Sequence, residues 1–404
     1  MKASPRVTLQ RGREKSLRQR HPWVYSGAIA RVEGAPQPGE TVTLHAADGA
    51  FLATAAWSPA SNIRARVWSF DPNAVIDPAF FAARVHAAVR ARSAMLDASH
   101  TACRLVHAES DGLPGFIVDR YADVAVVQCL AAGAERWRDA LVVAVHEATA
   151  CRTVFERSDA DVRALEGLDI RTGTILGTPP SSHQFVENDL AYRVDVACGQ
   201  KTGFFLDQRA NRAFVRSLAR DRDVLDCFCY TGGFTVAALA GGARSVRAID
   251  SSGDALTIAR ANVADNGLDE TRVEWRDADV FTELRALRDA RAEFDLVILD
   301  PPKLAPTARH APRAARAYKD INLLALKLLR PEGFLATFSC SGGVSAELFQ
   351  KIVAGAALDA RADAGIVGRF NASADHPVAL NFPEGEYLKG LLVRKNTPFG
   401  RSLS

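Results

Sequence analysis

The chain has 404 residues, of which 48% are hydrophobic and 24% are charged, and its formal net charge is +3. This length is too great for one ordinary core and predicts two or three domains, while the composition excludes a disordered chain. We find neither an apolar run near the roughly 18 residues of a membrane span nor a secretory leader, and expect a cytoplasmic protein with no membrane partner. The seven cysteines include no C-x-x-C pair, which argues against a disulfide framework and against a zinc site.

The positive charge is concentrated at the N-terminus. Residues 1–70 contain ten Lys or Arg and four Asp or Glu, whereas the remaining 334 residues contain 40 and 43. A basic segment of this kind is typical of nucleic-acid-binding proteins, although a solvated basic face or a compositional bias toward arginine gives the same count. Charge alone therefore leaves RNA or DNA binding open.

Three segments of the chain differ in their pattern. Residues 1–73 hold short β-like runs between Gly, Pro and Asp turns, which predicts a small all-β module. Residues 74–190 begin with a helix and then mix strands with one more helix, including a hairpin at 111–115, so a small α+β domain is expected. From 191 to 404 strands and helices alternate about every 25–30 residues, which predicts a parallel sheet with helices on both faces. Two late runs, 364–370 and 387–395, are expected to add edge strands.

Chemically useful residues follow successive strands of the third segment. In chain order they are the turn at 226–233 with its Gly-Gly pair, Asp250, Asp277 with Asp279, Asp300, and Cys340. Ligands of open α/β sheets bind beyond the carboxyl ends of the strands, so we expect these residues at one edge of the sheet. Each alone could be a turn or capping residue, but five in register are hard to ascribe to turns.

The turn at 226–233 does not have the spacing of a phosphate-binding loop. It lacks G-x-G-x-x-G, and no lysine follows it. An acidic residue about 20 positions further on, here Asp250, can bind a ribose diol. A ribose site without a phosphate loop favours a nucleoside cofactor that carries no phosphates, such as S-adenosylmethionine.

Several motifs resemble those of class I methyltransferases that act on C5 of cytosine in RNA. They are DCFCYTGGFTVAAL, AIDSS, DADVF, FDLVILDPPKLA and TFSCSG. With GREKSLRQRHPWVYSGAI, ESDGLPGFIVDRY, KTGFFLDQR and ADHPVALNFPEGEYLKG, the chain is similar over nearly its whole length to bacterial 23S rRNA cytosine-C5 methyltransferases of the RlmI type.

The resemblance implies a multidomain protein. Its parts are an N-terminal all-β PUA-like RNA-binding barrel (1–73), a small central α+β domain (74–190) and a C-terminal α/β, Rossmann-like class I methyltransferase domain (191–404). It also implies S-adenosylmethionine as cofactor, S-adenosylhomocysteine as product, no metal, and 23S rRNA or a large-subunit precursor as partner. A homodimer is compatible with the family.

Methylation at C5 of cytosine requires a nucleophile that first adds to C6, because C5 alone does not attack a methyl sulfonium. Cys340 is the cysteine that follows a strand at the expected catalytic edge. Cys227 and Cys229 are rivals, but they lie in the cofactor turn and should face the cofactor or the core. Lys303, or the helix after Gly343, is expected to favour the thiolate.

The resemblance also implies roles for individual residues. Asp300 would be the catalytic partner that donates to cytosine N3 and would also line the cofactor site, while Lys303 would contact substrate. The cofactor residues carried over from the family motifs are Asp207 and Arg209 on the methionine side, Phe228, Tyr230 and Gly232 in the turn, Asp250 for the ribose, and Asp279 for adenine, with Asp277 as its alternative.

The chain departs from the family pattern at two positions. Leu304 stands where the family ordinarily has Phe, so it is assigned no stacking role, and Asp226 stands where Asn is common. Lys303 lies near the place where other RNA cytosine-C5 enzymes have a second cysteine for product release, so Cys340 would act alone. Trp23 and Tyr25, with the basic residues around them, could stack on RNA or belong to the core, and are not assigned to a site.

Two other functions fit parts of the pattern. A methyltransferase for an exocyclic amine would use the Asp-Pro-Pro loop and would need no thiol. A non-catalytic RNA-binding or ribosome-assembly protein could retain the methyltransferase fold, although the set Asp250, Asp279, Asp300 and Cys340 argues against it.

Overall fold

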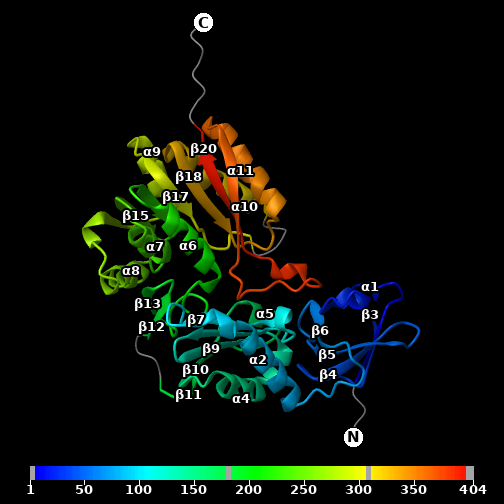
Figure 1. The fold of residues 1–404 in the computed structure, drawn as a ribbon. Coiled ribbons are helices and arrows are strands. Elements are labelled where there is room, and N and C mark those ends of the chain that lie inside the picture. The colour runs from blue at the N-terminus through cyan, green and yellow to red at the C-terminus, as the bar shows by residue number, and fades with distance from the viewer. Residues whose placement is uncertain (1–4, 179–182, 306–310, 397–404) are drawn as a thin grey trace. The chain divides into compact units, whose positions relative to one another are not determined.

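The computed structural model describes residues 5–178, 183–305 and 311–396, which form two compact units (Figure 1). Unit 1 comprises Met1–Glu187, Val194–Leu206 and Ala374–Gly385. Unit 2 comprises Asn188–Arg193, Asp207–Ser373 and Glu386–Ser404. Within the described ranges, no helix combines the length and the apolar character that a membrane crossing requires.

The N-terminal part of unit 1 is a six-stranded sheet in the order β2-β6-β5-β4-β1-β3, with the short helix α1 (Lys15–Arg18). Its strands are β1 (Arg6–Leu9), β2 (Trp23–Tyr25), β3 (Ile29–Glu33), β4 (Thr41–His45), β5 (Phe51–Trp57) and β6 (Ile63–Ser69). Alternate residues of β1 and β4 are buried, because one face of each strand packs on the core of this module. The predicted all-β module is confirmed.

The second part of unit 1 is a five-stranded sheet in the order β11-β10-β9-β8-β7. The strands are β7 (Ala102–His107), β8 (Phe116–Tyr121), β9 (Val124–Cys129), β10 (Thr153–Ser158) and β11 (Arg171–Leu176). The helices are α2 (Pro78–Arg92), α3 (Ala132–Arg136), α4 (Arg138–Thr149) and α5 (Val162–Leu165). Asp77 caps α2 by accepting from the backbone N–H of Phe80, with Pro78 at the first helical position. The predicted turn at 111–115 joins the antiparallel strands β7 and β8.

Unit 2 contains a seven-stranded sheet in the order β16-β15-β14-β17-β18-β20-β19. The strands are β14 (Asp223–Cys227), β15 (Ser245–Asp250), β16 (Val273–Asp277), β17 (Phe294–Leu299), β18 (Leu329–Ser339), β19 (Ala364–Asn371) and β20 (Lys389–Lys395). The first five strands in this spatial order are parallel, and the last two are antiparallel to their neighbours. Two further strands of the chain are β12 (His183–Glu187) and β13 (Leu190–Val194).

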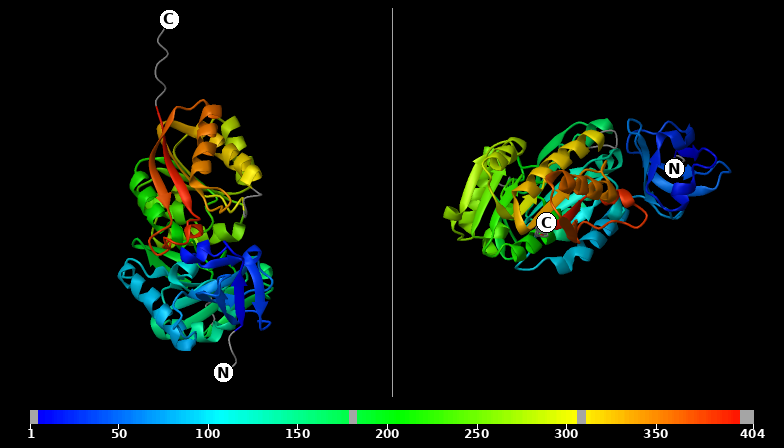
Figure 2. Two further views of the ribbon diagram at one scale, coloured as in Figure 1. Left: turned by 90° about the vertical axis from the view of Figure 1, so that its right-hand side faces the viewer. Right: turned by 90° about the horizontal axis from the view of Figure 1, so that it is seen from above.

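Helices cover both faces of this sheet, as the two views of Figure 2 show. One face carries α6 (Arg209–Leu218), α7 (Gly233–Ala240) and α8 (Gly253–Asp265). The other carries α9 (Val280–Asp289), α10 (Ala311–Leu328) and α11 (Ala346–Ala360). The predicted Rossmann-like α/β architecture is confirmed, and its core includes Leu225, Val297 and Leu335 from the strands and Phe349 from α11.

The two late strands differ from the expectation in one respect. The run 364–370 belongs to the edge strand β19, as predicted, but β20 lies between β18 and β19 rather than at an edge. Solvent exposure explains this order of strands. The first five residues of β20 are all buried, whereas most residues of β19 are at least partly exposed. A strand buried on both faces belongs in the interior of a sheet.

Candidate active site

The carboxyl ends of five parallel strands lie at one edge of the sheet of unit 2. Strand register sets Cys227 beside Ile249 on one side and Leu299 on the other, and sets Asp250 beside Asp277. The segments that follow these strands therefore lie next to one another. The edge expected from the sequence is thus present, and it brings together the turn at 228–233, Asp250, Asp277, Asp279, Asp300, Lys303 and Cys340.

The turn after β14 is held in an unusual backbone conformation. Phe228 and Tyr230 have positive φ angles of 63° and 50°, a region that costs free energy for residues with a side chain and persists only where its surroundings enforce it. Gly232, with φ of 77°, precedes α7, and a Cβ at this position would lie 2.9 Å from the Cβ of Ala259. Glycine is required here both for the angle and for the close approach of α8.

Asp250 fastens this turn to the neighbouring strand. Its Oδ2 accepts a hydrogen bond from the backbone N–H of Tyr230 at 2.8 Å, and its Oδ1 accepts one from Ser252 at 3.0 Å. Each carboxylate oxygen has a second lone pair, so Asp250 can still accept from a ligand hydroxyl. The residue that the sequence assigns to a ribose is therefore also the residue that shapes the turn.

The two acidic residues at the end of β16, Asp277 within the strand and Asp279 just after it, have different surroundings. Asp279 caps α9, because its Oδ1 accepts from the backbone N–H and from the hydroxyl of Thr282, at 2.9 and 2.8 Å. Asp277 faces the start of α8, where a Cβ at Gly253 would lie 3.0 Å from its Oδ2. Both side chains are exposed at the edge, so the choice between them as the adenine contact stays open.

Asp207 and Arg209 are buried at the start of α6, in the same unit. The Oδ2 of Asp207 accepts a hydrogen bond from the hydroxyl of Tyr387 at 2.6 Å, and its backbone oxygen accepts from Ser373 at 2.9 Å. Tyr387 lies two residues before β20, so Asp207 is tied to the strand that runs beside β18.

Asp226, the departure from the family pattern, is buried within β14. Its Oδ2 accepts from the hydroxyl of Thr235 at 2.7 Å, while its Oδ1 has no hydrogen-bond partner among the described residues. Burial raises the pKa of Asp226 to about 7, and the nearby charge of Asp250 adds to the shift. Near pH 7 the neutral and the ionised forms of this carboxyl group are therefore both populated.

The three cysteines near the edge differ in exposure. Cys227 and Cys229 are buried, and burial raises the pKa of both thiols well above the ordinary range, because a thiolate is poorly solvated there. Cys340 is only partly buried, and its Sγ lies 4.0 Å from the backbone oxygen of Pro301 in the Asp-Pro-Pro loop. The structure thus brings Cys340 next to the loop that carries Asp300 and Lys303, as the sequence predicted.

Tyr318 of α10 connects the two serines that flank Cys340. Its hydroxyl lies 2.9 Å from Oγ of Ser339, which donates to it, and 3.0 Å from Oγ of Ser341. The same Ser341 oxygen accepts from the backbone N–H of Ala305, at 3.0 Å, so the cysteine turn is fastened to the Asp-Pro-Pro loop. Burial raises the pKa of Tyr318, and the charges of Cys340 and Asp300 add to this shift.

Lys389, the first residue of β20, anchors the same turn from the other side. It pairs in register with Ser339, and its ammonium group donates to the backbone oxygens of Ser341 at 2.8 Å and Val344 at 2.7 Å. The side chain is only 7% exposed. Burial lowers the pKa of Lys389, while Cys340 and Glu386 raise it, so Cys340 lies within its electrostatic reach.

Sequence reasoning missed both Tyr318 and Lys389. The sequence favours Lys303, or the helix after Gly343, for stabilising the thiolate. Lys303 is exposed at this edge, whereas Lys389 is the buried cation. One signal was available, because a lysine inside the apolar run YLKGLLV is unusual for a strand buried on both faces. Leu304, the other departure from the family pattern, packs against the hydrophobic core of the unit.

The edge fits a nucleoside cofactor without phosphates. Its carboxylates can accept hydrogen bonds from the hydroxyls and the amino group of a nucleoside, and the glycine turn contains no basic residue that would bind a phosphate. The buried hydroxyl of Thr231 in that turn has no partner among the described residues. Asp250, the turn and one of the two acids at the end of β16 would hold such a group. In the ranges that the structure describes, His, Cys, Asp and Glu form no group of three or more that could hold a metal ion.

Comparison with known proteins identifies the family of the chain and agrees with the cofactor that this edge fits. A family model described as an S-adenosylmethionine-dependent methyltransferase matches residues 168–356, and a model of a PUA-like domain matches residues 7–70. The ribosomal RNA large subunit methyltransferase I of Shewanella amazonensis is 49% identical over 393 residues, which cover 97% of this chain and 99% of that protein. The protein of the same name from Tolumonas auensis is 50% identical over 394 residues, with the same coverage of both chains.

Solved structures give the same fold. A chain described as a SAM-dependent methyltransferase from Streptococcus mutans aligns with a TM-score of 0.84 and 21% identity, covering 96% of this chain and 99% of that one. A second solved chain with the same TM-score and coverage contains bound SAH. The chain therefore belongs to the ribosomal RNA large subunit methyltransferase I family, and it is an S-adenosylmethionine-dependent methyltransferase with an N-terminal PUA-like domain.

Proposed function

We propose that this protein methylates C5 of a cytosine in large-subunit (23S) ribosomal RNA through a covalent adduct between Cys340 and C6. The observation that carries the proposal is the setting of Cys340. It is the partly exposed cysteine of the sheet edge, fixed against the Asp-Pro-Pro loop and beside a buried ammonium group. The family name of its relatives supports the RNA substrate.

In the proposed reaction the Cys340 thiolate forms a bond to C6, and the electron pair of the C5–C6 double bond makes C5 nucleophilic. C5 would then form a bond to the methyl group that bound S-adenosylmethionine supplies, and the electron pair of the broken S–CH3 bond would stay on the sulfur of the product S-adenosylhomocysteine. A base removes the proton from C5, the double bond forms again, and the bond between Sγ and C6 breaks to return the thiolate.

Asp300 and Lys389 are proposed to stabilise the negative charges that form on the cytosine ring and on the thiolate of Cys340. Asp300 would donate a proton or a hydrogen bond to cytosine N3 and so stabilise the negative charge that addition drives into the ring, and a transferred proton would return to Asp300 on elimination. Lys389 would favour the thiolate of Cys340 before attack and after elimination. Lys303, which is exposed on the same loop, would contact the RNA.

The proposed cofactor contacts follow the residues of the edge. Phe228, Tyr230 and Gly232 would give the backbone surface, Asp250 would accept from the ribose hydroxyls, and Asp279 or Asp277 would accept from the adenine amino group. Asp207 and Arg209 are proposed for the methionine part, and Asp300 for the methyl-bearing end. No metal is proposed.

Replacement of Cys340 by serine tests the reaction. The Cys340→Ser enzyme should bind S-adenosylhomocysteine normally but lose methyl transfer to ribosomal RNA by about 1,000-fold or more, since the hydroxyl is a far weaker nucleophile near neutral pH. Cys198→Ser, at an exposed cysteine of unit 1, is the matched control and should keep full activity. Bisulfite sequencing of ribosomal RNA from a deletion strain would identify the target cytosine.

Full activity of Cys340→Ser would instead support methylation of an exocyclic amine, which needs no thiol. No binding of S-adenosylmethionine at millimolar concentration by calorimetry would support a non-catalytic RNA-binding role. We further propose a cytoplasmic location, a homodimer as oligomeric state, and domain boundaries at 1–73, 74–190 and 191–404.

A further inference from the structure

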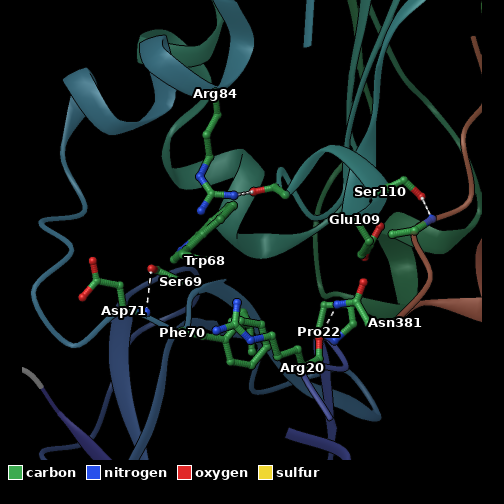
Figure 3. A pocket seen from close by; sticks show the side chains of 13 residues that line it. Arg20, Pro22, Trp68, Ser69, Phe70, Asp71, Arg84, Glu109, Ser110 and Asn381 are labelled. Atoms are coloured by element: carbon green, nitrogen blue, oxygen red, sulfur yellow. Dashed lines mark hydrogen bonds between the residues drawn. The ribbon is translucent and has the colours of Figure 1, made fainter. Parts of the chain in front are cut away.

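Unit 1 contains a pocket with an aromatic wall and two arginines (Figure 3). Its volume is about 400 Å³, within the range of about 300–1,000 Å³ that is typical of small-ligand sites. Trp68 and Phe70 form the aromatic wall, and Arg84 and Arg20 approach it from opposite sides in Figure 3. Every lining residue belongs to unit 1, so none of them belongs to the sheet edge that carries Cys340.

The two arginines have no acidic partner in the part of the chain that the structure describes. Arg84 donates one N–H to the backbone oxygen of Gly112 at 2.9 Å, and its guanidinium lies 4.4 Å from the ring centroid of Phe80. The guanidinium of Arg20 lies 5.8 Å from the ring centroid of Phe70. Burial lowers the pKa of Arg84, which reflects a cation that lost water without gaining a carboxylate. A bound anion would offset that cost.

Two carboxylates also line the pocket, but both have other partners. Oε1 of Glu109 accepts from Nε1 of Trp23 at 2.8 Å and lies 3.6 Å from Nε of Arg66. Asp71 is exposed to solvent, and its Oδ1 accepts from the backbone N–H of Asn73 at 2.9 Å. Glu109 therefore belongs to a group of charges with Arg66 and Glu166, and Asp71 faces solvent. The guanidinium groups of Arg20 and Arg84 are the cations that a phosphate in the pocket would meet.

We infer that this pocket binds one unpaired nucleotide of the RNA substrate, with the phosphodiester between Arg20 and Arg84 and the base against Phe70. Each guanidinium presents a planar fork of donors that matches phosphate oxygens. Unpaired bases stack on aromatic rings and on arginine planes. The side-chain oxygen of Asn381, whose Nδ2 donates to the backbone oxygen of Arg20, could accept a hydrogen bond from the edge of the base. The inference rests on the proposed RNA substrate and does not depend on the chemistry at Cys340.

Equilibrium binding of the full-length protein to a short unstructured RNA tests the inference. Fluorescence anisotropy at about 50 and 200 mM salt should show that Arg20→Gln and Arg84→Gln each weaken binding about 5- to 10-fold and reduce the salt slope by about one. Arg90→Gln is the matched control, because Arg90 is exposed on the same helix α2 but outside the pocket, and it should change binding less than about twofold. Pocket variants that bind like Arg90→Gln would overturn the inference.

Two further measurements exclude other causes of weaker RNA binding. The first tests whether a variant is misfolded, and the second tests whether the pocket binds a free small anion instead of RNA. Thermal unfolding and binding of S-adenosylhomocysteine should be unchanged in Arg20→Gln, whose side chain is exposed, so weaker RNA binding by that variant cannot come from misfolding. Cytidine monophosphate and inorganic phosphate serve as competitors. If Arg84→Gln abolishes binding of these small anions and leaves RNA affinity unchanged, the pocket holds a free ligand and the inference is wrong. If the wild-type protein does not bind RNA at all, it is the proposed substrate that fails.

Discussion

The ammonium group of Lys389 lies 2.8 Å from the backbone oxygen of Ser341, the residue that follows Cys340. A second hydrogen bond, to the backbone oxygen of Val344, also holds this buried ammonium group, and the backbone of Lys389 pairs in register with Ser339, the residue before Cys340. The charged groups within its electrostatic reach are Cys340, Glu386 and Lys303. In the proposed mechanism this buried ammonium group would stabilise a thiolate at Cys340, which is itself only partly buried.

Replacement of Lys389 by methionine should slow methyl transfer about 10- to 100-fold near neutral pH and move its pH dependence upward, because the thiolate loses its nearby cation. Lys389→Arg keeps the charge and should retain more of the activity. The direct measurement is alkylation of Cys340 by iodoacetamide as a function of pH, with the exposed Cys198 as internal reference. A purely structural role of Lys389 would leave the pH profile of alkylation unchanged in the methionine variant, provided that it still binds S-adenosylhomocysteine.

Tyr318→Phe should lower kcat about 10-fold with little change in the KM for the cofactor, since the hydroxyl that joins Ser339 to Ser341 no longer fixes the cysteine turn. We expect a loss of about 1–2 kcal/mol in stability from the missing hydrogen bonds. Tyr121→Phe removes a similarly buried hydroxyl in unit 1, which contacts Thr202, and is the control. Equal losses of kcat in the two variants would show that general destabilisation, and not the cysteine turn, causes the effect.

Asp226 should make the stability of the cofactor-free protein depend on pH. Its pKa is about 7 in the folded protein and 3.8 for the ordinary carboxyl group. Because the folded value is raised, the folded state is favoured most at low pH, and this stability is lost as pH rises from about 4 through about 7. Asp226→Asn removes the ionisation and should be more stable than the wild type at about pH 8, by a few kcal/mol, but not at about pH 4.

Thermal unfolding of Asp226→Asn and wild type across this pH range checks the prediction. Asp363→Asn, at an exposed carboxyl group of the same unit, should follow the wild type at every pH. If the difference between Asp226→Asn and wild type is independent of pH, then the carboxyl group of Asp226 does not titrate in this range.

The sequence predicted those site residues whose position depends only on which strand they end or follow along the chain. Asp250, Asp279 and Cys340 follow strands whose pattern is clear, and parallel strands place their carboxyl ends at one edge whatever the lengths of the connections. The resemblance to a known family added the roles of these residues, which the pattern alone left open.

What the sequence did not predict depends on contacts between distant segments. Lys389 reaches Ser341 because β20 inserts between β18 and β19, and strand order is not readable from the runs themselves. Arg20 and Arg84 come together in one pocket although an all-β module carries one and α2 carries the other. The run 387–395 reads as apolar in the sequence, but only the pairing of β20 with β18 and β19 shows that both of its faces are buried.

The most direct test of the proposed mechanism is a trapped adduct. Ribosomal RNA transcribed with 5-fluorocytidine has a fluorine at C5 that no base can remove as a proton, so the bond between Sγ and C6 should persist after methyl transfer. We predict a covalent complex between protein and RNA that forms only with S-adenosylmethionine present, and mass spectrometry should locate it on the peptide that contains Cys340. Methylation of ordinary RNA without any adduct on fluorinated RNA, or an adduct on Cys227 or Cys229, would contradict the assignment of Cys340 as the nucleophile.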